Sequence, residues 1–386
     1  MHKAFKYRIY PNKSQKVLLS KTFGCIRVIW NANVESFNSY DKDSNPKPKI
    51  IIKSDLIIDK PWLNEISAAA IQQKIRDFQE ITNQFFSKTR KKKIGRPSFK
   101  KKSGNQSYRL PNQKFSLKDN KIRLEKIGWV KISIDRNIPD NSKMLSCTIS
   151  MNCCGQYFVS ILVDVVIPNK GKTGKSVGID LGLKSFATLS DGVVIDNIKF
   201  FREKQSEIAK IQRHLSRKNK GSNRHRKNKI KIARLYNKIA NKRNNFLHNV
   251  TTSLVNNYDV ICIEDLNVSG MLSNHKLAKA ISDTSFSMFR SMLEYKCNWY
   301  GKELVVIDRF YPSSKTCSKC GWKKEDLTLS DRVFKCENCG IEIDRDLNAA
   351  INIQRVGVDI LYNRMQRDEV TNLNEASILN EASIME

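Results

Sequence analysis

The sequence of 386 residues has no amino-terminal signal pattern and no apolar run of about 18 residues, the length that a membrane-spanning helix needs. Acidic residues are also scarce, because 38 Asp and Glu stand against 69 Lys and Arg and leave a formal net charge of +31. This excess would repel itself unless a polyanion neutralised it, so we expect nucleic acid as the partner and no membrane. A hydrophobic fraction of 40% is enough to form cores in two or three domains.

Ten cysteines could suggest a secreted disulfide framework, but their spacing favours another role. Four of them fall late in the chain as two Cys-x-x-Cys pairs, the spacing of a metal site. The others lie mostly among apolar neighbours, where a reduced thiol packs as a small hydrophobic group; they are Cys25, Cys147, Cys153, Cys154, Cys262 and Cys297. Reduced thiols predict an intracellular, cytoplasmic protein.

The amino-terminal part of the chain mixes strand and helix patterns. Residues 3–10 alternate apolar and polar side chains, as a strand with one polar face does, and residues 14–37 and 54–86 have helical spacing. Strand alternation returns in three later segments, at 130–134, 145–151 and 157–165. We therefore expect a small β-barrel or sheet into which the early helices are inserted, followed by a Gly- and Lys-rich linker at 168–176.

Two segments concentrate the positive charge. Residues 87–102 carry nine Lys or Arg and no acid and should form a loop, and residues 199–243 carry seventeen Lys or Arg against two Glu and should be helical. Each segment could be a solvated charge run, the second as a helical hairpin. One-sided charge without compensating acids suits a bound phosphate backbone better, so we favour nucleic-acid contact for both.

The carboxyl-terminal half begins with the pattern of a three-stranded meander. A short apolar strand starting at Ser176 contains Asp180, and two further strands follow around an Asp191-Gly192 turn. The next predicted elements are a helix at 250–255, a strand at 259–264, a helix at 282–300, a strand at 304–307 and a helix from Asp344. The tail repeats Leu-Asn-Glu-Ala-Ser-Ile in tandem and is predicted to be a weakly ordered appendage.

Three carboxylates from separate elements are candidates for a two-metal site. Asp180 lies inside an apolar strand and Glu264 ends another, positions where an unpaired carboxylate is costly. Asp346 lies in the first turn of the last predicted helix. Cleavage of a phosphodiester by two metals needs such converging oxygen ligands, and we predict that Asp180, Glu264 and Asp346 bind two Mg²⁺, with Mn²⁺ as a substitute.

Each of these acids also has a structural explanation. Glu264 could pair with one of the many lysines, and both Asp344 and Asp346 could favour the amino terminus of a helix. We assign Asp344 as the helix cap, Asp346 as the metal ligand and Asp265 as support for the turn after Glu264.

The two Cys-x-x-Cys pairs predict a structural zinc ribbon. Fifteen residues separate Cys317-Ser-Lys-Cys320 from Cys336-Glu-Asn-Cys339, and a glycine follows each pair, as the tight turns of zinc knuckles require. Four thiolates close a tetrahedral site and leave no position for water. The bound Zn²⁺ should therefore stabilise the fold and take no part in catalysis.

Several of these motifs together resemble one family. Gly178-Ile-Asp180-Leu-Gly, Ile263-Glu264-Asp-Leu, the four-cysteine ribbon and Asp344-Arg-Asp346-Leu-Asn-Ala-Ala-Ile-Asn-Ile look like those of TnpB, the transposon-encoded protein also called OrfB transposase. Type V CRISPR effectors are more distant relatives. The resemblance is close over residues 176–356 and looser over residues 1–168, where Gly95-Arg-Pro-Ser-Phe-Lys also fits. The tail after about residue 357 is unmatched.

This resemblance implies an RNA-guided DNA endonuclease. A guide RNA from the transposon end would pair with one strand of double-stranded DNA after the protein reads a short transposon-adjacent motif. A single RuvC site would then cut both strands, in the cytosol or nucleoid of a prokaryote. Asp180, Glu264 and Asp346 match the RuvC triad and the four cysteines match the inserted zinc module. One protein per RNA is the favoured stoichiometry.

The resemblance also implies an α/β and α+β multidomain fold. Residues 1–13 and 108–168 would form a wedge β-barrel, and residues 14–107 a helical recognition insertion. Residues 169–310 and 341–360 would form an RNase H-like RuvC domain, interrupted by a zinc-ribbon, target-nucleic-acid-binding insertion at 311–340. Residues 361–386 would be the weakly ordered tail.

Two other functions compete with this one. A strand-transfer transposase could also use a carboxylate triad, but the sequence offers no tyrosine nucleophile beside a His pair. A non-enzymatic, RNA-guided DNA-binding repressor is disfavoured because all three acids of the triad are present.

Overall fold

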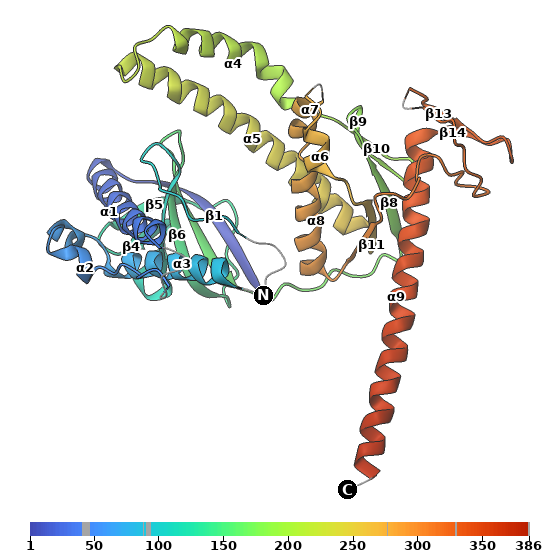
Figure 1. Cartoon of the computed structure of the whole chain (residues 1–386), viewed down its shortest axis with the longest axis horizontal. Helices are drawn as coiled ribbons and strands as arrows, with labels where there is room; N and C mark the ends of the chain where they lie inside the picture. Colours follow the sequence, from blue (N-terminus) through green and yellow to red (C-terminus); the bar gives the residue numbers. More distant parts are fainter. Residues whose placement is uncertain (41–46, 88, 90–93, 276, 329, 385–386) are drawn as a thin grey trace. The chain divides into compact units, whose positions relative to one another are not determined.

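The chain divides into two compact units, residues Met1–Val166 and Ile167–Glu386 (Figure 1). The computed structural model describes residues 1–40, 47–87, 89, 94–275, 277–328 and 330–384. Among these residues, no helix is both long and apolar enough to cross a membrane. The finer predicted division into wedge, recognition insertion, nuclease domain, ribbon and tail stays a prediction.

The first unit contains a seven-stranded antiparallel sheet with the order β2-β6-β7-β1-β5-β4-β3. Strand β1 (His2–Tyr10) lies inside this sheet between β7 (Tyr157–Asp164) and β5 (Gly128–Ser133). The remaining strands are β2 (Gln106–Pro111), β3 (Phe115–Lys118), β4 (Lys121–Leu124) and β6 (Lys143–Met151). Alternate side chains of β1, from Phe5 to Ile9, are buried, which confirms the predicted strand at the start of the chain.

Sequence patterns found only part of this sheet. The predicted strands correspond to β1, β5, β6 and β7, whereas β2, β3 and β4 were missed. These three are four to six residues long, too short for alternation to stand out from the surrounding polar residues. Asp119 and Asn120 both adopt positive φ in the turn between β3 and β4, a signal for a tight hairpin that the sequence does carry.

Of the two helical ranges predicted in the first unit, the first forms one helix and the second is divided. Helix α1 (Lys13–Asn38) begins at the cap Asn12, which exchanges hydrogen bonds with Gln15. The predicted helical range 54–86 forms three pieces, which are α2 (Ser54–Ile57), a 3₁₀ turn (Pro61–Glu65) and α3 (Ala68–Phe86). Pro61 interrupts the helical backbone and Ser67 caps a new helix by accepting a bond from Ala70 N. Of the basic segment 87–102, residues 88 and 90–93 lie outside the described part, and the rest forms no helix or strand.

The second unit is built on a mixed five-stranded sheet with the order β10-β9-β8-β11-β12. Strands β8 (Ser176–Leu181), β9 (Ser185–Leu189) and β10 (Val194–Asp196) form the predicted antiparallel meander. Strand β11 (Val260–Glu264) pairs in parallel with β8, and β12 (Glu303–Ile307) pairs in parallel with β11. The two strands that contain Asp180 and Glu264 are therefore neighbours.

Helices cover both faces of this sheet. On one face Val177, Ile179 and Ile261 pack in a core with α5 (Asn223–Asn257) and α8 (Phe286–Tyr300). On the other face Cys262 and Val305 pack against α9 (Arg345–Ile384), which crosses β8, β11 and β12. Successive strand residues point to opposite faces, so Asp180, two residues beyond Gly178, lies on the α9 side.

Two further features of this unit bear on function. Helix α4 (Phe200–Ser216) and α5 form a hairpin (Figure 1), which packs through Phe200, Ile208 and Ile239. This hairpin contains the predicted basic stretch. Short helices α6 (Val268–Leu272) and α7 (Ala278–Thr284) precede α8, and β13 (Val333–Lys335) pairs with β14 (Glu342–Asp344) in the cysteine module.

The backbone of the tail is helical as far as Ile384, and its predicted weak order stays a prediction. Its repeat contains the helix-forming residues Leu, Glu and Ala and neither Gly nor Pro, so the backbone can continue the helix that begins at Arg345.

Candidate functional site

Asp180 and Glu264 lie on adjacent parallel strands at the same edge of the sheet. The register pairs Gly178 with Cys262 and Ile179 with Ile263, so Asp180 and Glu264 are the next residues along their strands. Because side chains alternate between faces, both carboxylates lie on the face that α9 covers. Asp346 is in the first turn of that helix. The three predicted acids therefore approach one another from β8, β11 and α9.

Two glycines allow α9 to pack closely against the strands. A Cβ atom at Gly178 would lie 2.0 Å from the Ala350 carbonyl oxygen, and one at Gly357 would lie 2.3 Å from Cys262 Sγ. Neither separation is possible for real atoms, so only glycine permits this approach of helix and sheet. The sequence alone gives no sign of this packing role for either glycine.

Electrostatic coupling links the three carboxylates. Burial raises the pKa of Asp180 to about 7, and the negative charges of Glu264 and Asp346 add to this increase. Burial also raises the pKa of Glu264. The hydroxyl of Ser313 donates a hydrogen bond to Glu264 Oε1, and this bond lowers the same pKa. A divalent cation would offset this repulsion, and carboxylate oxygens are the ligands that Mg²⁺ prefers, so the donor set fits such an ion.

The neighbouring acids have structural partners. Asp344 Oδ1 accepts the backbone N–H groups of Asp346 and Leu347 at 2.9 and 3.0 Å, so Asp344 caps α9 as predicted. Asp265 pairs with Arg290 at 2.5 Å and also with Arg309, which fixes the turn after β11. Asp346 also has a partner, since it pairs with Arg345 at 3.2 Å. Of the two acids in the Asp-Arg-Asp motif, Asp346 contributes more to the raised pKa of Asp180.

The four cysteines form a much tighter group than the carboxylates. Their Sγ atoms all lie within 4.8 Å of one another, and among the described residues this is the one set of three or more acids, cysteines or histidines that gathers so closely. Gly321 and Gly340 follow the two pairs with φ of +78° and +70°, and each glycine N–H donates to the first cysteine of its pair. The Trp322 backbone N–H lowers the pKa of the Cys320 thiol, which favours the thiolate that binds metal. Four thiolates at this spacing fit a structural Zn²⁺.

The remaining six cysteines are free thiols, as predicted. Five of them are buried and Cys153 is exposed. Among the described residues no disulfide joins any of the ten.

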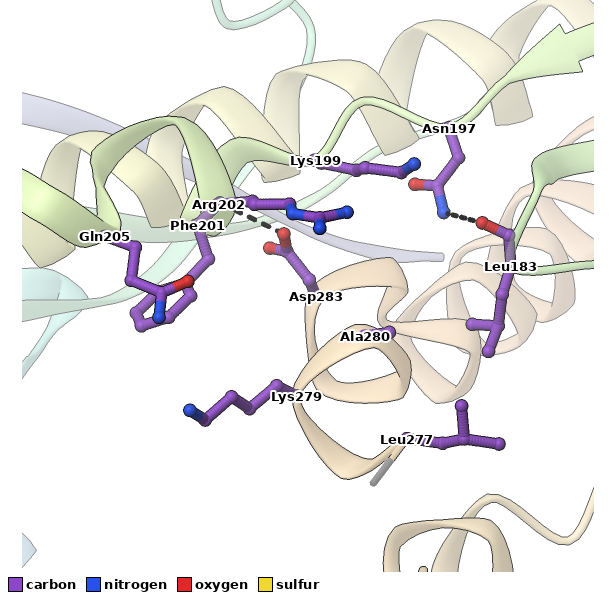
Figure 2. Close-up of a pocket in the computed structure, with 10 residues that line it drawn as sticks. All are labelled: Leu183, Asn197, Lys199, Phe201, Arg202, Gln205, Leu277, Lys279, Ala280 and Asp283. Atoms are coloured by element: carbon purple, nitrogen blue, oxygen red, sulfur yellow. Dashed lines mark hydrogen bonds between the residues drawn. The ribbon is translucent and has the colours of Figure 1, made fainter. Parts of the chain in front are cut away.

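A cationic pocket of about 430 Å³ lies beside the start of the basic hairpin. Figure 2 shows Lys199, Arg202 and Lys279 around it, together with Asp283 from α7. Asp283 accepts a bond from the Phe201 backbone N–H at 3.0 Å and pairs with Arg243, so its charge is already compensated. Within the described part of the chain, no acid forms an ion pair with Lys199, Arg202 or Lys279. The pocket therefore extends the positive surface of the hairpin.

Comparison with known proteins gives family matches over most of the chain. Residues 158–275 match a family described as "Probable transposase", residues 286–353 match "Cas12f1-like, TNB domain" and residues 1–35 match a "Helix-turn-helix domain". The structure of residues 1–35 contains strand β1 followed by α1, so this range holds one helix rather than two.

Relatives that match over most of this chain point to the same kind of protein. A protein of Streptomyces pristinaespiralis named "Putative RNA-guided DNA endonuclease" is 38% identical over 363 residues, covering 92% of this chain and 89% of the relative. The InsQ protein of Escherichia coli K12, which has the same description, is 30% identical and covers 93% of each chain. The TnpB-like protein L79 of Acanthamoeba polyphaga mimivirus is 28% identical over 92% of this chain.

One solved structure shares the fold. The protein of a Cas12f1–sgRNA–target DNA complex superimposes with a TM-score of 0.54 at 14% identity, covering 92% of this chain and 98% of the other. The mixed sheet and the four-cysteine module therefore belong to a fold class that this chain shares with the Cas12f1 protein. Within that class, the chain belongs to the TnpB family, also called OrfB.

Proposed function

We propose that this chain is an RNA-guided DNA endonuclease that cleaves double-stranded DNA beside a short transposon-adjacent motif. The single observation that carries the proposal is the position of Asp180 and Glu264 at the ends of two adjacent parallel strands, on the face covered by the helix whose first turn contains Asp346. The names of the two relatives at 30% identity or more support the same activity. The sheet order supports an RNase H-like RuvC domain, because an antiparallel meander of three strands is extended by two parallel strands.

In this proposal Asp180, Glu264 and Asp346 hold two Mg²⁺ ions. Such ions stabilise the attacking and leaving oxygens of a phosphodiester. The residues of the chain contribute position: β8 and β11 fix two carboxylates side by side, and Asp344 fixes the helix start that carries the third. The four cysteines would hold a structural Zn²⁺ that takes no part in this chemistry.

The basic surfaces would hold the guide RNA and the target. The α4–α5 hairpin carries one-sided positive charge, and its polyanionic partner would be the phosphate backbone of a heteroduplex. We assign the first unit, with its antiparallel sheet and early helices, to the wedge and recognition functions. One protein molecule would act with one guide RNA that derives from the transposon end.

A cleavage assay tests the proposal. The full-length protein is purified with its RNA, the RNA is sequenced, and the complex is incubated with Mg²⁺ and a plasmid carrying the matching target. We expect cutting by the wild type and its loss in Asp180→Ala, with DNA binding retained. Asp196→Ala is the matched control, because Asp196 lies on β10 of the same sheet and is exposed. Cutting that survives Asp180→Ala would refute the triad.

A further inference from the structure

The loop between β12 and the first cysteine pair is held by two buried asparagines of α9. Asn348 and Asn352 are both 0% exposed. Asn348 Nδ2 donates to the Thr316 carbonyl at 2.7 Å, and Asn352 Nδ2 donates to the carbonyls of Ser313 and Thr316 at 2.8 and 2.6 Å. Residues four apart share one face of a helix, so both amides point at the same loop.

The same loop contacts each candidate metal site. At one end the buried Ser313 hydroxyl donates to Glu264 Oε1. At the other end the backbone N–H of Ser318, between Cys317 and Cys320, donates to Asn348 Oδ1 at 2.9 Å. A continuous set of hydrogen bonds therefore joins the first zinc knuckle, the loop, Glu264 and the helix that begins with Asp346.

This arrangement determines the orientation of Glu264. The Ser313 bond occupies Oε1, and among the described residues Oε2 has no hydrogen-bond donor, which leaves that oxygen for a cation. Ser313 in turn has its carbonyl fixed by Asn352, two turns of helix from Asp346. Groups that hold a metal-binding carboxylate in this way normally change metal affinity by about 10- to 100-fold when they are removed.

We propose that Ser313, Asn348 and Asn352 are positioning residues, which fix the Glu264 carboxylate relative to Asp346 and connect this geometry to the zinc ribbon. This inference rests on the proposed function, since it assigns these residues to the cation site of the nuclease. A purely structural role predicts something different: their removal would lower thermal stability and leave cation affinity unchanged.

The primary test compares Ser313→Ala with Ser314→Ala, the adjacent serine for which no hydrogen bond to Glu264 exists. Calorimetric titration of Mn²⁺ into the full-length protein with its RNA measures the binding that Asp180→Ala abolishes. We expect Ser313→Ala to weaken this binding by about 10-fold or more, with an unchanged zinc content, and Ser314→Ala to bind as the wild type does. The Ser313→Ala substitution should also raise the Mg²⁺ concentration needed for half-maximal cutting. Mn²⁺ affinity within twofold of wild type in Ser313→Ala overturns the inference.

A double-mutant cycle with Asn352→Ala tests the connection itself. If Asn352 acts on Glu264 through Ser313, the double variant should bind Mn²⁺ no more weakly than the worse single variant. Effects that multiply would mean that the two residues act separately, which contradicts the proposed connection. If Asn352→Ala fails to fold, the Ser313 titration still decides.

The result also separates the two proposals. Absence of both Mn²⁺ binding and cutting in the wild type would remove the proposed function. A wild type that binds and cuts, with a Ser313→Ala variant that behaves identically, would remove only the positioning role.

Discussion

The two candidate metal sites are assembled in opposite ways. The four cysteines fall within 23 residues of sequence, from Cys317 to Cys339, and two glycine turns bring their sulfur atoms together. The carboxylates come from β8, β11 and α9, and only the strand order and the packing of α9 make them neighbours. The first site therefore depends on local turns, and the second depends on the fold of the whole second unit.

The largest expected effect concerns the carboxylate site. Asp346→Ala should lower the cutting rate by at least about 10²-fold, comparable to removing one group that stabilises a transition state. Asp344→Ala is its neighbour and control: it removes a helix cap, so it should cost about 1 kcal/mol of stability and leave most of the activity. Cutting rates and thermal unfolding measure both. Equal losses of activity in the two variants would contradict the different roles assigned to them.

A cysteine substitution should have its main effect on the zinc site. Cys320→Ser removes one of the four thiolates. We expect the wild type to contain about one zinc ion per chain and this variant to contain much less. The five-stranded sheet should stay folded, because the ribbon's ligands are local in sequence. Elemental analysis and limited proteolysis provide the two measurements. Cys153→Ser, at an exposed free thiol, should retain zinc; a loss of zinc there, or its retention in Cys320→Ser, would show that the cluster is assigned wrongly.

A smaller effect should follow from loosening the contact of helix and sheet. Gly178→Ala places a methyl group against the Ala350 carbonyl, so α9 must shift, at a cost of about 1–3 kcal/mol. Denaturant unfolding measures the loss, and zinc content should be unchanged because the ribbon does not contain this contact. Gly171→Ala serves as the control, since nothing lies within 4 Å of a Cβ at that position. Equal stability of the two variants would mean that the close packing is absent in solution.

The smallest effect should leave both metal sites intact. Replacing Lys227, Lys231 and Lys238 of α5 with Gln removes three exposed charges from the hairpin. If all three contact phosphates, the slope of log affinity against log salt should become shallower by about 2–3. Nucleic-acid binding at several salt concentrations measures this slope, and the corresponding Lys→Arg variant should keep it. An unchanged slope would mean that these lysines do not contact phosphates and that this part of the hairpin is a solvated surface.

Sequence patterns predicted the cysteine module more completely than the carboxylate site. The Cys-x-x-Cys spacing and the following glycines carry the geometry of the cluster within a short segment, so no knowledge of the fold is needed. For Asp180 and Glu264 the sequence indicated buried acids on two strands, and the structure shows that those strands pair in parallel. Their role as metal ligands stays a prediction.

What the sequence did not indicate depends on contacts between distant segments. Ser313 and Asn352 lie 39 residues apart, and their bond exists only because α9 crosses the sheet beside the loop. Gly178 and Gly357 are ordinary glycines in sequence, and the need for them comes from helix–strand packing. The buried asparagines of Asn-Ala-Ala-Ile-Asn were the one available signal, because polar residues four apart on an otherwise apolar helical face require partners.

Diffraction from crystals containing Mn²⁺ would test the central claim most directly. Anomalous scattering locates Mn²⁺ without reference to activity. We predict Mn²⁺ peaks in contact with carboxylate oxygens of Asp180, Glu264 and Asp346 in the wild type, and none there in Asp180→Ala. Mn²⁺ bound elsewhere, or absent from between these three side chains, would contradict the assignment of this edge of the sheet as the cation site.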